Sequence, residues 1–167
     1  MSDHENVDVE IDTADAGASQ SEPKSLGEIK KGDYVVMNDN RPCKVVAYST
    51  AKTGKHGAAK AMYTGIDIFT GKKYEASDST GHSVFVPFID RKDYQVVCAA
   101  DDGYLTLMNT ETGDTRQDLK FPDDTEDDAK LTERIKDFLD AGTDCKVTVL
   151  KSMGIEKIID TAELKGQ

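Results

Sequence analysis

A lysine flanked by glycines lies in a basic segment, residues 49–60, whose residue types are suited to binding phosphate groups. The side chains or backbone groups that would make contacts there belong to Lys52, Thr53, Gly54, Lys55, His56, Gly57 and Lys60. Gly54 and Gly57 bracket Lys55, and glycine permits positive φ or the close approach of another backbone. Residues 41–66 contain no Asp or Glu. A basic hairpin tip without carboxylates is suited to reaching RNA phosphates, with an affinity that falls steeply with salt.

Other chemistries for this segment do not match its residues. A nucleotide phosphate-binding loop needs Gly at position 49 and Ser or Thr at position 56, but Ser49 and His56 stand there. His56 has no nucleophile and orienting carboxylate nearby in the sequence, as a general base would need. His4, His56 and His82 show no metal-ligand spacing, alone or with cysteine. From the residues alone, an RNA-contacting loop and a solvated basic turn are about equally good interpretations.

The net charge of −11 hides an uneven distribution along the chain. Residues 1–23 carry seven acids and no Lys or Arg, a balance of −7. Residues 24–90 carry ten Lys and Arg against seven Asp and Glu, a balance of +3, whereas residues 91–167 carry eleven against eighteen, again −7. Since nucleic-acid binding needs positive charge, an RNA contact is expected only in the middle third.

The first part of the chain is predicted to be a tail followed by a small barrel. Residues 1–24 are acidic and poor in apolar residues, so we expect a disordered tail with order beginning near Ser25. Residues 25–90 alternate short β-branched runs with turn signals such as residues 38–42 and 70–73, which is typical of a small β-barrel of the SH3-like kind. Its strands are predicted at residues 32–37, 43–48, 60–69 and 83–88.

A second domain is predicted over residues 91–167, after a polar break at residues 89–93. Strands are expected at residues 94–100 and 104–109, a hairpin signal at 109–116, and two closing strands at 146–153 and 155–164, with a partly helical conformation as the alternative for the last. The acidic residues 122–128 can cap a helix that continues to Gly142, since carboxylates complement the helix dipole there. Strands with one intervening helix indicate an OB-fold, so the fold class is mostly β.

Cysteine usage and hydropathy indicate a reducing, aqueous compartment. Cys43, Cys98 and Cys145 are odd in number and widely spaced, which predicts neither a disulfide framework nor a zinc site. No apolar run approaches the length of a membrane span, and no secretion signal is present. We therefore expect a cytoplasmic protein without a membrane partner.

The sequence resembles a known family over residues 25–164. Residues 44–60 (KVVAYSTAKTGKHGAAK) and 65–75 (GIDIFTGKKYE) closely resemble the eukaryotic translation initiation factor 5A family. Residues 102–105 and 116–119 extend the resemblance into the second domain. The matching position implies that Lys55 is the lysine that this family converts to hypusine.

The resemblance also implies cofactors and partners. No cofactor is expected to stay bound. Deoxyhypusine synthase would transfer an aminobutyl group from spermidine to Lys55, using NAD, and deoxyhypusine hydroxylase would complete hypusine. The factor would bind the 80S ribosome near the exit site, with hypusine at the acceptor end of the P-site tRNA. It would thereby promote peptide-bond formation at stalled sequences such as polyproline and support elongation and termination. Family members can form homodimers.

The sequence leaves two alternative functions open. One is an RNA-binding or RNA-chaperone module that works with an unmodified Lys55, which would tolerate Lys55→Arg where a hypusine-dependent factor would not. The other is an enzyme, which is disfavoured because the sequence shows no cluster of nucleophile, base and metal ligand.

Overall fold

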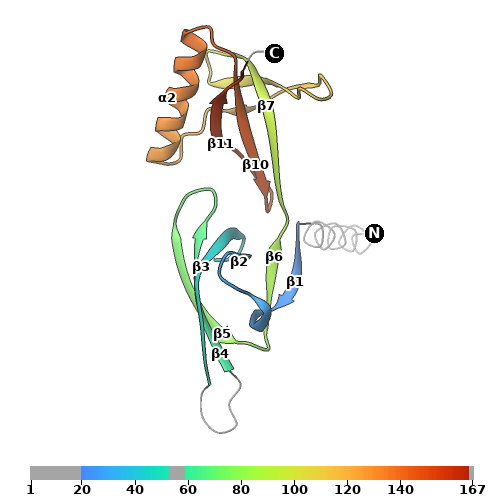
Figure 1. Cartoon of the computed structure of the whole chain (residues 1–167), viewed down its shortest axis with the longest axis vertical. Coiled ribbons are helices and arrows are strands. Elements are labelled where there is room, and N and C mark those ends of the chain that lie inside the picture. Colours follow the sequence, from blue (N-terminus) through green and yellow to red (C-terminus); the bar gives the residue numbers. More distant parts are fainter. Residues whose placement is uncertain (1–19, 53–58, 166–167) are drawn as a thin grey trace, which may run out of the picture. The chain divides into compact units, whose positions relative to one another are not determined.

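The computed structural model describes residues 20–52 and 59–165, and these residues are mostly β-strand with one α-helix (Figure 1). Contacts divide the chain into two compact units. Unit 1 comprises residues 1–88 with Ser152–Gly154, and unit 2 comprises Ile89–Lys151 with Ile155–Gln167. The mostly β fold class predicted from the sequence is confirmed.

Unit 1 is built on a four-stranded antiparallel sheet in the order β2-β3-β4-β5. These strands are β2 (Tyr34–Met37), β3 (Arg41–Lys52), β4 (Ala59–Asp67) and β5 (Lys73–Ser79). One face of the sheet forms the core, where Val35, Cys43, Val45, Ala61 and Tyr63 are all less than a tenth exposed. The alternation of side chains along each strand sends every second residue into this core, which explains the β-branched runs in the sequence.

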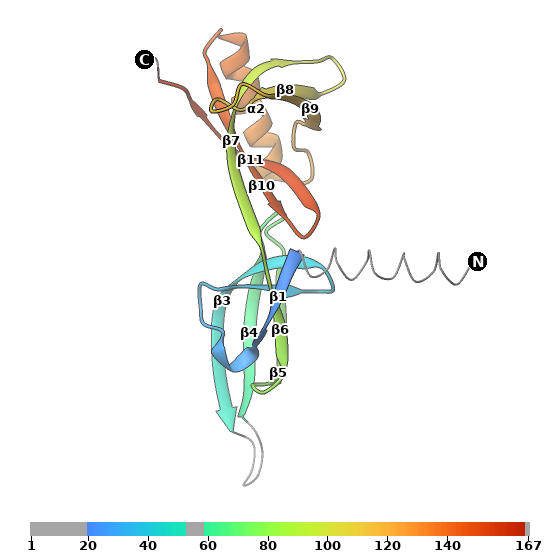
Figure 2. The same ribbon diagram turned by 90° about the vertical axis from the view of Figure 1, so that its right-hand side faces the viewer.

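A second, two-stranded sheet pairs β1 (Ser21–Ser25) with β6 (Ser83–Pro87), as Figure 2 shows. Strand β1 leads directly into the 3-10 helix η1 (Leu26–Glu28), whose Leu26 is fully buried. The boundary expected near Ser25 is therefore corrected, because strand structure begins at Ser21. The reason is a long-range pairing with β6 that the composition of the segment does not reveal. Residues 1–19, where the acidic tail was expected, lie outside the described residues.

The Asp67 carboxylate holds the turn between β4 and β5. It is 2% exposed and accepts hydrogen bonds from Arg41 Nε at 2.6 Å, Phe69 N at 2.8 Å and Thr70 N at 3.2 Å. Burial has the largest single effect on the pKa of Asp67 and raises it, but the Arg41 hydrogen bond and the two backbone donors together outweigh burial. The pKa of Asp67 is consequently lower than its ordinary value.

Unit 2 contains a five-stranded sheet in the order β11-β10-β7-β8-β9. Its strands are β7 (Ile89–Ala99), β8 (Tyr104–Met108), β9 (Thr115–Lys120), β10 (Cys145–Ser152) and β11 (Ile155–Glu163). Residues 89–93, expected as a polar break, instead form the exposed beginning of β7. Strand β9 was expected only as part of a hairpin signal, since its polar sequence TRQDLK lacks the alternation of a half-buried strand.

The α-helix α2 (Glu126–Asp140) begins where the acidic segment predicted a helix. Thr125 is the N-cap of a capping box with Asp128, and three acids occupy the first turn. Asp128 Oδ2 also contacts Lys157 Nζ on β11 at 2.6 Å, with both side chains nearly buried. The helix contributes Leu131 and Ile135 to the core of unit 2.

The described strands form open sheets, so the two barrels expected from the sequence are not closed by backbone pairing in that part of the chain. In unit 2 the two edge strands are joined by side chains instead. Arg116 on β9 donates to Glu156 on β11 through Nη1 at 2.8 Å and Nη2 at 3.0 Å. The same guanidinium lies 5.5 Å from the centre of the Tyr94 ring. The hydrogen bonds from Arg116 hold the pKa of Glu156 below its ordinary value.

We predict that unit 1 loses stability in acid through Asp67. An unfolded Asp titrates near pH 4, and the folded pKa is lower, so the carboxylate contributes stability that is present above about pH 4 and lost as pH falls through the folded pKa. Asp67→Asn should lower the free energy of unfolding by about 2 kcal/mol at pH 7, and its difference from wild type should shrink below pH ~4. Urea unfolding of unit 1, followed by NMR across this pH range, measures the difference.

Asp39→Asn is the matched control for this prediction, because Asp39 is an exposed turn residue of the same unit. It should change the stability little at any of these pH values. A difference between wild type and Asp67→Asn that stayed constant from neutral to acid pH would contradict the assigned role of the carboxylate.

Candidate functional site

The candidate site lies where strands β3 and β4 run out of the core of unit 1 (Figure 1). The antiparallel pairing continues without a further irregularity from Ala47 opposite Thr64 to Lys52 opposite Ala59. Ser49, Thr50, Ala51 and Lys52 are all exposed, so this end of β3 is held by its backbone pairing rather than by burial. The six residues 53–58 connect the two neighbouring strand ends in the sequence.

The structure describes only part of the predicted loop. Lys52 ends β3 and Lys60 is the second residue of β4, and both side chains are exposed. The pairing brings them to the same end of two neighbouring strands, as the sequence predicted for a hairpin. The other residues named from the sequence lie outside the described residues, namely Thr53, Gly54, Lys55, His56 and Gly57.

The start of β4 is fixed to the rest of unit 1 by hydrogen bonds that converge on Thr80. Thr80 N donates to Ala59 O at 2.9 Å, which holds the first residue after the loop. Thr80 O accepts from Gly27 N and from Ser25 Oγ, each at 2.9 Å. Lys52, at the end of β3, pairs with Ala59 on β4, and Thr80 connects Ala59 by hydrogen bonds to Gly27 of η1.

Tyr48 ties the other strand of the hairpin to the same segment. Its hydroxyl donates to Leu26 O at 2.9 Å, and Leu26 N donates to His82 O at 2.8 Å. Sequence reasoning missed Ser25, Tyr48 and Thr80 as positioning residues. Their partners lie 21 to 55 residues away, and no local spacing in the sequence indicates such contacts.

Lys60 lies near a carboxylate that already has partners. Asp78 Oδ1 lies 2.7 Å from His82 Nδ1 and accepts a hydrogen bond from Ser79 N at 2.7 Å. These contacts, with a smaller effect of Lys60, hold the pKa of Asp78 below its ordinary value. Neither Lys52 nor Lys60 forms an ion pair with a carboxylate in the described part of the chain, so both ammonium groups are available to an external anion.

The remaining candidate chemistry gives no second site. In the described ranges, no three His, Cys, Asp or Glu side chains lie together in a way that could hold a metal ion. Cys43 and Cys145 are buried free thiols and Cys98 is an exposed one. Burial raises the pKa of Cys43 to about 11, which keeps this thiol protonated and unreactive. No helix in the described chain is both long and apolar enough to cross a membrane.

Comparison with known proteins gives a consistent result along the whole described chain. The family "Translation initiation factor 5A-like, N-terminal" matches residues 19–82. The family "Eukaryotic elongation factor 5A hypusine, DNA-binding OB fold" matches residues 88–161. Eukaryotic translation initiation factor 5A-1 of Arabidopsis thaliana is 45% identical over 158 residues, which cover 95% of this chain and 94% of that protein. The corresponding protein of Solanum lycopersicum is 47% identical, with 87% of each chain covered.

Solved structures give the same result. A translation initiation factor 5A family protein from Naegleria fowleri matches with a TM-score of 0.81 and 47% identity, covering 87% of this chain and 99% of that one. Eukaryotic translation initiation factor 5A from Methanococcus jannaschii matches with a TM-score of 0.61 and 30% identity, covering 86% and 96%.

A β-rich unit with a basic hairpin segment, followed by a unit that matches the OB-fold family of the hypusine-containing factor, is the arrangement of a translation factor family. The chain belongs to the eukaryotic translation initiation factor 5A family. As a member of a translation factor family, the chain works with the ribosome.

We predict that Ser25→Ala loosens the base of the hairpin. The change removes the hydroxyl donor to Thr80 O, and a lost hydrogen bond costs about 1 kcal/mol, which corresponds to roughly fivefold faster local opening. Hydrogen exchange measured by mass spectrometry should therefore speed up by about that factor at the start of β4 and around Thr80.

Ser83→Ala is the matched control, because Ser83 lies directly opposite Ser25 on β6 and is exposed. It should leave the exchange at the start of β4 unchanged. Equal acceleration by the two variants would show that the Ser25 hydroxyl does not position the hairpin.

Proposed function

We propose that this chain binds the 80S ribosome near the exit site and uses hypusine at Lys55 to position the acceptor end of the P-site tRNA. Positioning of this kind promotes peptide-bond formation at stalled sequences such as polyproline and supports elongation and termination. The peptidyl-transfer chemistry stays with the ribosome, and the factor contributes orientation, which is a large part of the barrier in many reactions. Membership of the translation factor family supports the proposal.

The observation that carries the proposal is the pairing of β3 with β4 up to Lys52 and Ala59. Lys55 lies in the six-residue connection between these two strand ends, and the strands are fixed at their base through Thr80 and Tyr48. An acceptor lysine on a narrow connection between two braced strands can enter a deep enzyme pocket and later reach a deep site on the ribosome. Gly54 and Gly57 on either side of it give the backbone the freedom this needs.

The modification changes what the lysine can do. Deoxyhypusine synthase would form a C–N bond between Lys55 Nζ and the aminobutyl group of spermidine as the C–N bond of spermidine breaks and 1,3-diaminopropane leaves, with NAD taking up and returning the hydride. Deoxyhypusine hydroxylase would then insert one oxygen atom from dioxygen into a C–H bond. The side chain becomes longer and carries a second amine, so a point charge becomes a flexible dication. Two separated positive charges can contact phosphate and ribose groups of an RNA end at the same time.

The remaining loop residues support this contact in the proposal. Lys52 and Lys60 are exposed at the two strand ends, and neither forms an ion pair with a carboxylate in the described chain, although Asp78 lies near Lys60. By their place in the sequence, the proposal also assigns contacts with RNA to Thr53, Gly54, His56 and Gly57. The proposal places the factor in the cytoplasm, without a membrane partner. A homodimer stays a prediction, which analytical ultracentrifugation of native protein decides.

A second candidate function is an RNA-binding or RNA-chaperone module that uses an unmodified Lys55. It is favoured by the absence of acids from residues 41–66, which is a property of the chain before any modification. The two candidates differ in the state of Lys55 in native material.

We predict that protein purified from its native cells carries hypusine on Lys55. Intact and peptide mass spectrometry should show an increment of one aminobutyl group plus one oxygen on Lys55, with Lys52 and Lys60 free of it. The Lys55→Arg variant expressed in the same cells is the matched control and should show no increment. A bare Lys55 in native protein would contradict the proposal and favour the RNA-binding module.

A further inference from the structure

The sheet of unit 1 has a second face, opposite the core, that runs from the hairpin along β3, β4 and β5. We call it the outer face. The register defines it, because residues directly opposite one another share a side of the sheet. Ala61, Tyr63 and Gly65 of β4 are buried on the core side, so Lys60, Met62, Thr64 and Ile66 point the other way. Their partners on β3 and β5 include Lys44, Ser49, Lys73 and Ser77.

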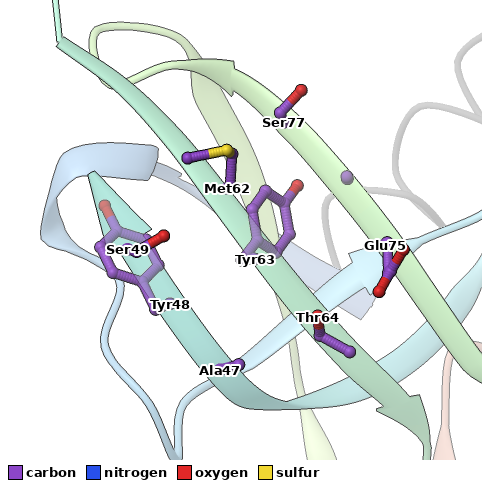
Figure 3. A pocket seen from close by; sticks show the side chains of 9 residues that line it. Ala47, Tyr48, Ser49, Met62, Tyr63, Thr64, Glu75 and Ser77 are labelled. Carbon is purple, nitrogen blue, oxygen red and sulfur yellow. The ribbon is translucent and has the colours of Figure 1, made fainter. Parts of the chain in front are cut away.

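The outer face is hollowed in its middle, as Figure 3 shows. A groove of about 650 Å³ crosses the three strands and is lined by Ser49, Met62, Thr64 and Ser77 among others. Met62 is 47% exposed, so its apolar side chain is open to a ligand in the groove. The groove exists because the residues opposite Met62 are both serine, which leaves space on either side of it.

Positive charge lies at both ends of this groove. Lys60 lies at the end next to the hairpin, and Lys44 and Lys73 flank Ile66 at the other end. Six residues of extended strand separate the two ends, about 20 Å, while three strands are about 10 Å wide. Glu75 carries the one negative charge among the described residues of these strands that point outward, and Asp78 on the core side of β5 is occupied by His82.

We propose that the outer face binds a single RNA strand that continues from the hairpin, so that the factor holds RNA along the sheet as well as at Lys55. This inference rests on the proposed function and adds a surface to it. The lysines at the two ends contact phosphates. The hydroxyls of Ser49, Thr64 and Ser77 bond ribose and phosphate oxygens, and Met62 packs against a base or sugar between them.

The shape and charge of the face favour RNA over a peptide. A strip about 10 Å wide accommodates one sugar-phosphate strand. Three lysines against one carboxylate repel a basic peptide. Among the described residues that line the groove, Tyr48 and Tyr63 belong to the core side, so Met62 is the large apolar side chain that points outward to an amphipathic peptide. Hydroxyl groups between separated cations suit a polymer that alternates phosphate with ribose.

Fluorescence anisotropy with the full chain and a labelled single-stranded oligouridylate tests the lysines. The double variant Lys44→Gln, Lys73→Gln removes two phosphate contacts. Since the salt dependence for a single strand scales as about 0.7 per contact, the slope of log affinity against log salt should fall by about 1.4. The control double variant Lys30→Gln, Lys31→Gln removes the same charge from exposed positions of unit 1 outside this sheet, and should leave the slope unchanged. Equal changes in the two double variants, or no change in either, would overturn the proposal.

The Met62 methyl group gives a second readout that does not depend on a variant. In methyl-labelled protein, the oligouridylate should shift the Met62 signal and leave that of Met37, which is 6% exposed in the core, unchanged. No shift at Met62 at saturating RNA would overturn the proposal. A Met62 shift produced by purified ribosomal proteins but not by the oligouridylate or by deproteinised ribosomal RNA would assign the face to a protein partner, and would overturn it too.

These measurements use protein made with an unmodified Lys55, so they separate the outer face from the proposed function. If the slope did not change as predicted but native Lys55 carried hypusine, the proposed RNA binding by the outer face would be wrong and the proposed function would stand. The expected slope change with a bare native Lys55 would keep the outer face and favour the RNA-binding module.

Discussion

The pairing of β3 with β4 is the constraint on which the rest of unit 1 depends. Its register is fixed by burial, because a slip of one residue would turn Ala61 and Tyr63 out of the core. Gly65 permits the close packing, since a Cβ there would lie 2.5 Å from Met37 Sδ and 3.0 Å from Cys43 Cβ. The same register sets Lys52 beside Ala59 and turns Met62 outward, so both RNA-contacting surfaces that we propose follow from it.

Charge is divided between the two units in a way that suits selective binding. Residues 24–90 have a positive balance and residues 91–167 a strongly negative one. In unit 2 many acids have structural partners, such as Asp128 with Lys157 and Glu156 with Arg116, and therefore stabilise the unit. The surplus of negative charge still disfavours unspecific contact with nucleic-acid backbones. In the function that we propose, this charge distribution would direct RNA to unit 1.

Local sequence patterns predicted most helices and strands, whereas the long-range contacts between them are visible only in the structure. β-branched runs and turn residues predicted the mostly β fold class and the strands on either side of the basic loop. Capping residues predicted the helix that begins at the acidic segment. Strand β1 was not predicted because its stability comes from pairing with β6. Strand β9 was not predicted because its sequence is polar, and its Arg116 bonds to Glu156 on a strand far away in the sequence. The sequence also predicted a hairpin that places Lys52 and Lys60 at neighbouring strand ends, but the hydrogen bonds of Thr80 join residues far apart along the chain.

The central claim is that Lys55 acts through its modification rather than through its charge. Lys55→Arg keeps the charge and prevents the modification, whereas Lys30→Arg makes the same exchange at an exposed position away from the hairpin. Each variant should be expressed in cells depleted of the native factor, and translation of a polyproline reporter compared with that of a reporter without proline runs. The account predicts that Lys30→Arg restores both reporters, while Lys55→Arg fails on the polyproline reporter. Full restoration by Lys55→Arg would contradict it.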